Sequence, residues 1–371
     1  MNRNWSYGAL RSAGVCSGLR SLLLKQLRTT GSVLLVGLCV HLFSNLNAQA
    51  RAELPIYTPT IAVSGVIRVW GSTEMAGVLR KWEEGFKAHQ PQIRFDDHLY
   101  GTASSIAGLY TGVADVALLG RDIWPIERTA FESVLHYDST GIQVATGSYD
   151  VPKAAYALVL YVNRANPLSQ LTLKQLAGVF GVPIETVHGT AISTWGELGL
   201  GGSWSQLPLH LYSFDYDNDK AIFFRRTIFA ARYHSKDSIR EFTNRINSDG
   251  SITDSGQLIL DALANDPLGI AVSNPHYAND HVKPLALSAD GKTFVMADKR
   301  SVMERAYPLS RPVWIHVNLP PAGRLDVKIS EFLSYVLSEE GQECVIQDGT
   351  YLPLTAKLAD EQSRKVKPPL R

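Results

Sequence analysis

The sequence is poor in cysteine, balanced in charge and without a hydrophobic run long enough to cross a membrane. Three cysteines in 371 residues exclude the disulfide-rich class of small secreted domains. Its 36 Lys and Arg residues nearly match its 35 Asp and Glu residues, giving a formal net charge of +1 without a polybasic segment. The electrostatic signature of proteins that bind nucleic acid or anionic membranes is therefore missing. We expect no nucleic-acid partner and favour a small-molecule ligand.

The first fifty residues have the pattern of a secretory signal peptide. Basic residues precede an apolar run from Val33 to Phe43, and Ala48-Gln49-Ala50 matches a small-residue cleavage site. The run is shorter than the roughly 20 residues that a spanning helix needs. We therefore predict a signal peptide over residues 1–50 and export to a periplasmic or other extracytoplasmic space, with an uncleaved membrane anchor as the alternative. Cleavage leaves Cys344 as the one cysteine of the mature chain.

After a predicted linker over residues 51–60, short β-rich runs alternate with amphipathic helices. Five apolar side chains follow the strand Val66 to Trp70 at the spacing of one helical face: Met75, Val78, Leu79, Trp82 and Phe86. The same reasoning predicts further strands at 92–98, 115–119, 155–162, 208–212 and 269–272, and helices at 106–113, 173–180, 221–231, 239–246 and 327–338, the last one ending at Gly341. Strands that alternate with helices predict an α/β fold with largely parallel sheets. The length predicts two lobes, because single domains rarely exceed about 250 to 300 residues.

Three polar turns follow the first three predicted strands. They are Gly71-Ser72-Thr73, Gly101-Thr102-Ala103-Ser104-Ser105 and Gly120-Arg121-Asp122. Ligands of open α/β sheets bind at the carboxyl ends of the strands, where the next helices begin. Free amides and the positive end of the helix dipole make such a helix start a seat for an anion. We therefore expect the three turns to converge on one anion-binding site.

A local alternative exists for each turn. Ser72 or Thr73, and Ser104 or Ser105, are preferred N-cap residues that could simply satisfy their own helices. Asp122 could likewise cap the segment that starts near Pro125. In a binding site, a carboxylate accepts a hydrogen bond only from a ligand that carries a proton, so Asp122 would favour hydrogenphosphate over sulfate.

The chain resembles the phosphate-binding proteins of bacterial ABC transporters over roughly residues 64–355. The matching segments are "GSTEMAGVLRKW", "YGTASSIAGLYTGVADVALLGRD", "LVLYVNRANPL", "LTLKQLAGVFG", "STWGELG", "DPLGIAVS", "YPLSRPVWIHV" and "VKISEFLSYVLSEEGQECVIQDGTYLPL". The resemblance implies the type II periplasmic-binding-protein fold, with two α/β lobes joined by a two-segment hinge. It implies that residues 61–154 and 270–371 form one lobe and 155–269 the other. It also places Thr73, Ser104 and Asp122 where the family contacts phosphate.

The fourth phosphate contact of the family is altered in this chain. Where the family has an Arg and then Ser-Gly-Thr, the chain has "SFDYDNDKAIFFRR", with Ser213 at the Arg position and Asp217-Asn218-Asp219 over Ser-Gly-Thr. Carboxylates at a helix start would occupy its amides and repel an anion, and Asp217 or Asp219 could simply be the N-cap. An oxyanion site therefore needs another cation. Arg121 is our first candidate, and Lys220, Arg225 and Arg226 are the others. The alternative for Arg121 is a charge on a loop that faces solvent.

Other chemistries fit the sequence less well. Asp215, Asp217 and Asp219 resemble the start of a calcium loop, but Lys220 and Arg226 stand where that loop needs Gly and Glu. We expect no metal, no cofactor and no catalytic residues. We predict a monomeric solute-binding protein that traps phosphate or a related oxyanion and delivers it to an ABC permease. The alternatives are a secreted sensor or scaffold of the same fold that binds a non-phosphate ligand or a partner protein, and an extracytoplasmic phosphate-ester hydrolase.

Overall fold

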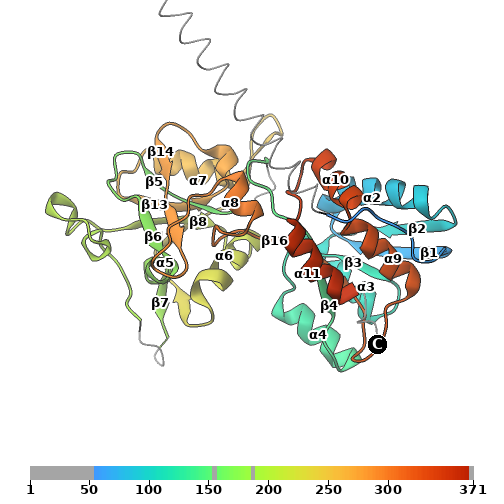
Figure 1. Ribbon diagram of the computed structural model, residues 1–371. Coiled ribbons are helices and arrows are strands. Elements are labelled where there is room, and N and C mark those ends of the chain that lie inside the picture. Colours follow the sequence, from blue (N-terminus) through green and yellow to red (C-terminus); the bar gives the residue numbers. More distant parts are fainter. Residues whose placement is uncertain (1–53, 153–156, 185–188, 367–371) are drawn as a thin grey trace, which may run out of the picture. The chain divides into compact units, whose positions relative to one another are not determined.

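The computed structural model describes residues 54–152, 157–184 and 189–366 (Figure 1). The predicted signal peptide and the start of the predicted linker lie outside these described residues. Within them, every helix is too short or too polar to cross a bilayer.

The first lobe is built on a mixed five-stranded sheet in the order β2-β1-β3-β16-β4. Its strands are β1 (Gly65–Gly71), β2 (Ile93–His98), β3 (Val116–Leu118), β4 (Thr140–Thr146) and β16 (Pro312–Val317). β2, β1 and β3 are parallel, whereas β16 runs antiparallel to both of its neighbours. Because β16 comes from late in the chain, this lobe is discontinuous in sequence.

Helices cover both faces of the first sheet (Figure 1). They are α2 (Ala76–His89), which follows the short 3-10 turn η1 (Thr73–Met75), α3 (Thr102–Tyr110), α4 (Pro125–Leu135), α9 (Val327–Val336), α10 (Glu339–Asp348) and α11 (Ala356–Val366). β3 shows the division: Val116 and Leu118 join the core under α2, α9, α10 and α11, and Ala117 and Leu119 join a second core under α3 and α4. Such alternation is the expected period of a strand buried on both faces.

The predicted apolar face of α2 is confirmed. Its five positions, from Met75 to Phe86, are each at most 1% exposed. Burying a large apolar side chain stabilises the fold by roughly 1.5 to 3 kcal/mol, so this face alone fixes the helix against the sheet.

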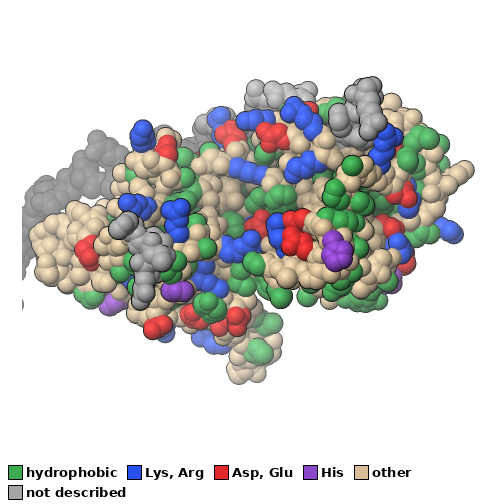
Figure 2. All heavy atoms as spheres, turned by 90° about the horizontal axis from the view of Figure 1, so that it is seen from below, with side chains coloured by type: hydrophobic (Ala, Val, Ile, Leu, Met, Phe, Trp, Pro, Cys, Tyr) green, Lys and Arg blue, Asp and Glu red, His purple; other side chains and the backbone are tan. Residues whose placement is uncertain are grey.

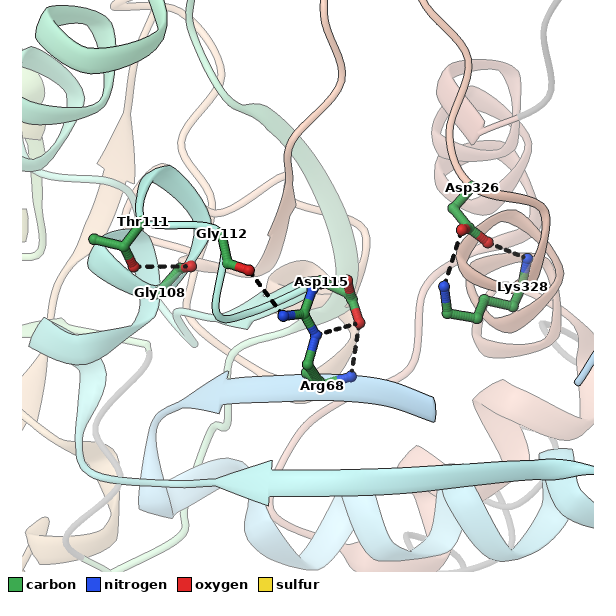
Figure 3. Close-up of polar contacts among 7 residues, drawn as sticks. All are labelled: Arg68, Gly108, Thr111, Gly112, Asp115, Asp326 and Lys328. Carbon is green, nitrogen blue, oxygen red and sulfur yellow. Dashed lines mark hydrogen bonds and ion pairs between the residues drawn. The ribbon is translucent and has the colours of Figure 1, made fainter. Parts of the chain in front are cut away.

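An ion pair joins β1 to the loop before β3, at the far end of β3 from its polar turn (Figure 3). The Arg68 guanidinium donates to both carboxylate oxygens of Asp115, at 2.7 and 3.1 Å, and to the Gly112 carbonyl at 2.8 Å. Burial alone would raise the pKa of Asp115, but the hydrogen bonds from the Arg68 side chain and backbone outweigh it and lower this pKa. The pair therefore stabilises the fold when Asp115 is ionised.

The second lobe repeats the arrangement with the order β10-β8-β13-β5-β14. Its strands are β5 (Val159–Asn163), β8 (His210–Phe214), β10 (Ile239–Phe242), β13 (Gly269–Ser273) and β14 (Val282–Pro284). Again three parallel strands are followed by antiparallel neighbours. The remaining elements are helices α5 (Leu173–Phe180), α6 (Asp219–Phe229), α7 (Ser255–Ala264) and α8 (Lys299–Met303), 3-10 turns η2 (Gly196–Leu198), η3 (Gly202–Trp204) and η4 (Pro275–Tyr277), and the strand pairs β6 (Gln170–Thr172) with β15 (Ala286–Ser288), β7 (Gly181–Pro183) with β9 (Tyr233–Ser235) and β11 (Arg245–Ile246) with β12 (Ile252–Thr253).

Two segments connect the lobes and lie side by side. The Gly147 amide donates to the Arg311 carbonyl at 2.7 Å, and the Leu158 amide donates to the Leu309 carbonyl at 3.4 Å. An antiparallel bridge joins Ala157 to Ser310. The predicted two-segment hinge is therefore confirmed.

Three details of the sequence prediction are wrong. The return to the first lobe does not occur at residue 270, because β13, β14 and β15 pair with strands of the second lobe and the chain rejoins the first sheet at Pro312. Residues 239–246 are not a helix, since β10 pairs with β8 and β11 with β12. Gly341 does not end a helix but lies inside α10, where a Cβ would come 2.1 Å from the Tyr335 carbonyl oxygen.

Candidate ligand-binding site

The three polar turns of the first lobe meet at one edge of its sheet, as predicted. The Ser72 amide donates to the Leu118 carbonyl at 3.0 Å, and the Gly101 amide donates to the Gly71 carbonyl at 2.9 Å. Gly71 has a φ of +151°, and a Cβ there would lie 2.2 Å from the Leu118 oxygen and 2.8 Å from Ser105 Oγ. The turns therefore approach one another so closely that this position requires glycine.

The hydroxyls of these turns fall into two groups. Ser72 and Ser105 are buried; Ser72 Oγ accepts the Glu74 amide at 3.3 Å, as an N-cap would, and Ser105 Oγ donates to the Leu118 carbonyl at 3.0 Å. Thr73 is exposed, and Thr102 and Ser104 are half-buried. Ser105 therefore joins its turn to the end of β3 and Ser72 caps its own turn, whereas Thr73, Thr102 and Ser104 are at least partly exposed.

Helix α3 begins without a side-chain cap. Its N-cap is Gly101, with a φ of +105°, and neither Ser104 nor Ser105 takes that place as the capping alternative assumed. Ser104 Oγ instead donates to the Gly101 carbonyl at 2.8 Å. The Ser104 amide donates to the Gly101 carbonyl at 3.1 Å, so the amides of Thr102 and Ala103 are the ones at this helix start that no side chain caps, as at helix starts that bind anions.

The third turn fixes a carboxylate at the same edge. The Leu119 and Gly120 amides both donate to the Trp314 carbonyl at 3.1 Å, and the Trp314 indole Nε1 donates to Asp122 Oδ1 at 2.8 Å. Asp122 does not cap α4, whose N-cap is Trp124. It is instead oriented by the neighbouring strand β16.

Arg121 is not a solvent-facing charge, and its guanidinium is paired within the first lobe. Its side chain is 6% exposed, and its Nη1 and Nη2 atoms pair with Glu127 Oε2 and Oε1 at 2.8 and 2.7 Å. Nη1 also donates to the Asp122 carbonyl at 2.8 Å, and the guanidinium lies 4.0 Å from the Trp124 ring centroid. Glu127 therefore neutralises the charge that we expected to replace the family's arginine.

The second lobe contributes the start of α6. Ser213 is buried at the end of β8, and Asp217 is exposed. The N-cap is Asn218, whose Oδ1 accepts the Lys220 amide at 3.0 Å, so the prediction of Asp217 or Asp219 as the cap is wrong. Asp219 Oδ2 instead accepts a hydrogen bond from Arg311 Nη1 at 2.9 Å.

Arg311 is a buried cation near the same sheet edge that the sequence analysis did not single out. It precedes β16 directly, its side chain is 2% exposed, and its guanidinium lies 5.5 Å from the Phe223 ring centroid of α6. Because β16 is antiparallel to β3, with Ile315 opposite Leu118, Arg311 lies beyond the same sheet edge as the turn that carries Asp122. The available signal was a lone Arg between Ser310 and Pro312 in an otherwise apolar segment.

A pocket of 880 Å³ lies beside α6 and is lined mostly by the second lobe. Its lining includes Arg225, Arg226 and Phe229, residues of β9 and β10, and Pro125 of the first lobe; it contains the candidate cations Arg225 and Arg226 but none of the turn residues of the first lobe. Arg226, on its wall, donates to the Ile123 carbonyl of the first lobe at 3.0 Å. Among the described residues no group of three or more His, Cys, Asp or Glu side chains could hold a metal ion. Basic and acidic side chains are interspersed on the face drawn in Figure 2.

The comparisons with known proteins agree with this architecture. Residues 57–340 match the profile of the PBP superfamily domain. The "Phosphate-binding protein PstS" of Pseudomonas aeruginosa is 29% identical over 320 residues, which cover 86% of this chain and 92% of that protein. "Protein SphX" of Synechococcus elongatus is 24% identical, covering 84% and 83% of the two chains. The crystal structure of PstS from Borrelia burgdorferi is 13% identical, covers 79% of this chain and 100% of its own, and superposes with a TM-score of 0.53, a likeness of fold.

Proposed function

Because this chain belongs to the PBP superfamily, we propose that it is the solute-binding protein of an ABC transporter and binds phosphate or a related oxyanion between its lobes. Relatives that span most of the chain are named phosphate-binding proteins. The proposal depends on one structural observation above all, the convergence of three strand-to-helix turns at a single sheet edge.

That edge offers the groups an oxyanion needs. The uncapped start of α3 supplies amide donors and the positive end of the helix dipole. Thr73 and Thr102 add hydroxyls that can donate as well as accept, and Ser104, whose hydroxyl donates to the Gly101 carbonyl, adds an acceptor. Asp122, held by Trp314, accepts a hydrogen bond from a protonated ligand and repels one without a proton. Phosphate satisfies this combination, and sulfate does not.

The remaining roles follow from this proposal. The protein is exported, acts as a monomer because both halves of the site come from one chain, and delivers its ligand to a membrane permease. Closure of the lobes about the hinge excludes water and strengthens each hydrogen bond to the ligand. Binding needs no cofactor, and the protein is not an enzyme; phosphate release from a model ester would contradict this part of the proposal.

Calorimetric titration of the purified protein with phosphate and with sulfate tests the function. We expect saturable binding of one phosphate and no measurable heat with sulfate. A protein that takes up neither anion would refute the proposal.

A matched pair of proline variants tests the site. Thr102→Pro places proline at the first position of α3, where helices tolerate it, and removes one amide donor. Loss of one hydrogen bond to a charged ligand costs about 1.5 to 3 kcal/mol, which is roughly a 10- to 100-fold weaker Kd. Thr102→Ala measures how much the Thr102 hydroxyl contributes to the phosphate affinity, separately from the amide. Ala356→Pro, at the first position of α11, is the control that should leave affinity unchanged. If Thr102→Pro and Ala356→Pro bind phosphate with equal affinity, the start of α3 does not bind the ligand.

A further inference from the structure

Arg311 is a buried cation at the junction of both lobes. Its backbone carbonyl accepts the Gly147 amide of the other hinge segment, and its side chain extends to α6 of the second lobe. The guanidinium is 2% exposed and lies over the ring of Phe223, an apolar setting in which charge interactions are stronger than in water. A buried guanidinium requires an anionic partner, since an uncompensated charge is costly to bury.

The carboxylate that faces Arg311 is much less confined. Asp219 is 42% exposed, occupies the first position of α6, and is joined to Arg311 by a hydrogen bond between Nη1 and Oδ2. The cap of α6 is supplied by Asn218, so Asp219 is not needed for that purpose. An anionic side chain at this place lies between a cation and the positive end of a helix, as a bound oxyanion would.

Arg121 and Arg311 differ in this respect. Arg121 binds Glu127 through two parallel hydrogen bonds, and both side chains are mostly buried, at 6% and 12% exposure. Such a bidentate pair has a fixed geometry. Asp219, in contrast, can turn into water while Arg311 stays where it is. Arg311 is thus a cation of this region whose carboxylate partner, Asp219, can be exchanged for a ligand.

We propose that Arg311 binds the phosphate ligand and that Asp219 occupies its place when no ligand is present. This inference rests on the proposed function. Arg311 then supplies, from the hinge, the positive charge that the chain lacks at Ser213. Phosphate displaces the Asp219 carboxylate, so the affinity of the site reflects a competition between an internal and an external anion.

The competition predicts opposite effects for the two partners. Arg311→Gln removes the cation and should weaken phosphate binding at least 30-fold. Arg311→Lys keeps the charge but not the planar guanidinium, so its phosphate affinity should lie between those of the wild type and Arg311→Gln. Asp219→Asn removes the internal competitor and should tighten phosphate binding about three- to tenfold. A merely structural ion pair would give the same sign for both changes, because either substitution would break the same contact.

The experiment is a phosphate titration by calorimetry of the full chain and these variants, with thermal unfolding to confirm that each is folded. Arg68→Gln and Asp115→Asn are matched controls, since they break an ion pair at the far end of β3 and should leave phosphate affinity unchanged (Figure 3). If Arg311→Gln fails to fold, the tightening in Asp219→Asn still decides the question.

The outcomes separate this inference from the proposed function. Wild-type protein that does not bind phosphate refutes the function and the inference together. Wild-type protein that binds phosphate, with Asp219→Asn unchanged or weaker, overturns the inference alone. Unchanged binding in Arg311→Gln does the same.

Discussion

Glu127 should be the most sensitive position in the first lobe outside its apolar core. Its carboxylate pairs with both Nη atoms of Arg121 at 2.8 and 2.7 Å and also accepts the Trp124 amide at 2.8 Å. One side chain thereby caps α4, neutralises a buried guanidinium and fixes the turn that carries Asp122. Glu127→Gln keeps the shape and replaces one oxygen by an amide nitrogen that cannot accept from Arg121.

The magnitude follows from burial. Breaking one side of a buried ion pair costs about 3 to 5 kcal/mol, because the remaining charge stays out of water. The pair is 6% and 12% exposed, so solvent screens little of this cost. Since the carboxamide retains one acceptor oxygen, we expect Glu127→Gln to lower the free energy of unfolding by about 3 kcal/mol, the lower end of that range.

A double-mutant cycle with Arg121→Met measures the pair itself. Urea unfolding, followed by tryptophan fluorescence, gives the free energy for the wild type, each single variant and the double variant. The double variant, which buries no charge, should be more stable than Glu127→Gln alone, with a coupling energy of about 1.5 kcal/mol or more. Coupling below about 0.5 kcal/mol, typical of exposed pairs, would refute the reasoning.

Three further predictions concern the same lobe. Asp115→Asn should lower the free energy of unfolding near neutral pH and flatten its dependence on acid. The lowered pKa of Asp115 gives a stabilising contribution that is fully present above about pH 4, the ordinary pKa of Asp, and is lost as the pH falls through the folded-state pKa. Urea midpoints measured between about pH 2 and pH 7 test this. Arg68→Ala should remove the same acid dependence, and a steep one that persists would contradict the assignment. Gly71→Ala should lower the melting temperature by several degrees and weaken phosphate binding, because its Cβ would meet a backbone oxygen of β3 at 2.2 Å; a variant as stable as the wild type would contradict that packing. Asp122→Asn should lose the preference for phosphate over sulfate in competitive titration, and a retained preference would assign the discrimination to another residue.

The sequence predicted well those features that depend on local periodicity. The apolar face from Met75 to Phe86 predicted α2, and the predicted helix at residues 173–180 coincides with α5. The convergence of the three turns could also be predicted, because parallel strands bring their carboxyl ends to one edge.

The features that depend on partners distant in sequence could not be predicted in this way. Residues 239–246 contain apolar positions at helical spacing, but pairing of β10 with β8 decides their conformation. The assignment of β13 to the second lobe likewise follows from its pairing with β8 and β5. Gly341 has the sequence character of a helix end, and only the approach of the Tyr335 carbonyl explains why glycine stands inside α10.

The charged groups of the site show the same limit. Arg121 and Glu127 lie six residues apart, a spacing that no simple helical rule pairs, and the pair forms because Glu127 turns back to cap α4. Arg311 and Asp219 lie in different lobes and meet only through the hinge. Sequence reasoning could recognise that the chain lacks the arginine of the family at Ser213, but not that Arg311 lies opposite Asp219.

The two lobes therefore contribute different parts of ligand recognition. The first lobe offers main-chain amides, hydroxyls and Asp122, the groups that the family resemblance assigns to phosphate. The second lobe carries the acidic start of α6 where the family has Ser-Gly-Thr, so this departure from the family lies in the half of the site that contains Asp219. Any difference in phosphate affinity between this protein and its phosphate-binding relatives should then follow substitutions at Asp219 and Arg311, whereas the preference for phosphate over sulfate should follow Asp122 in the first lobe.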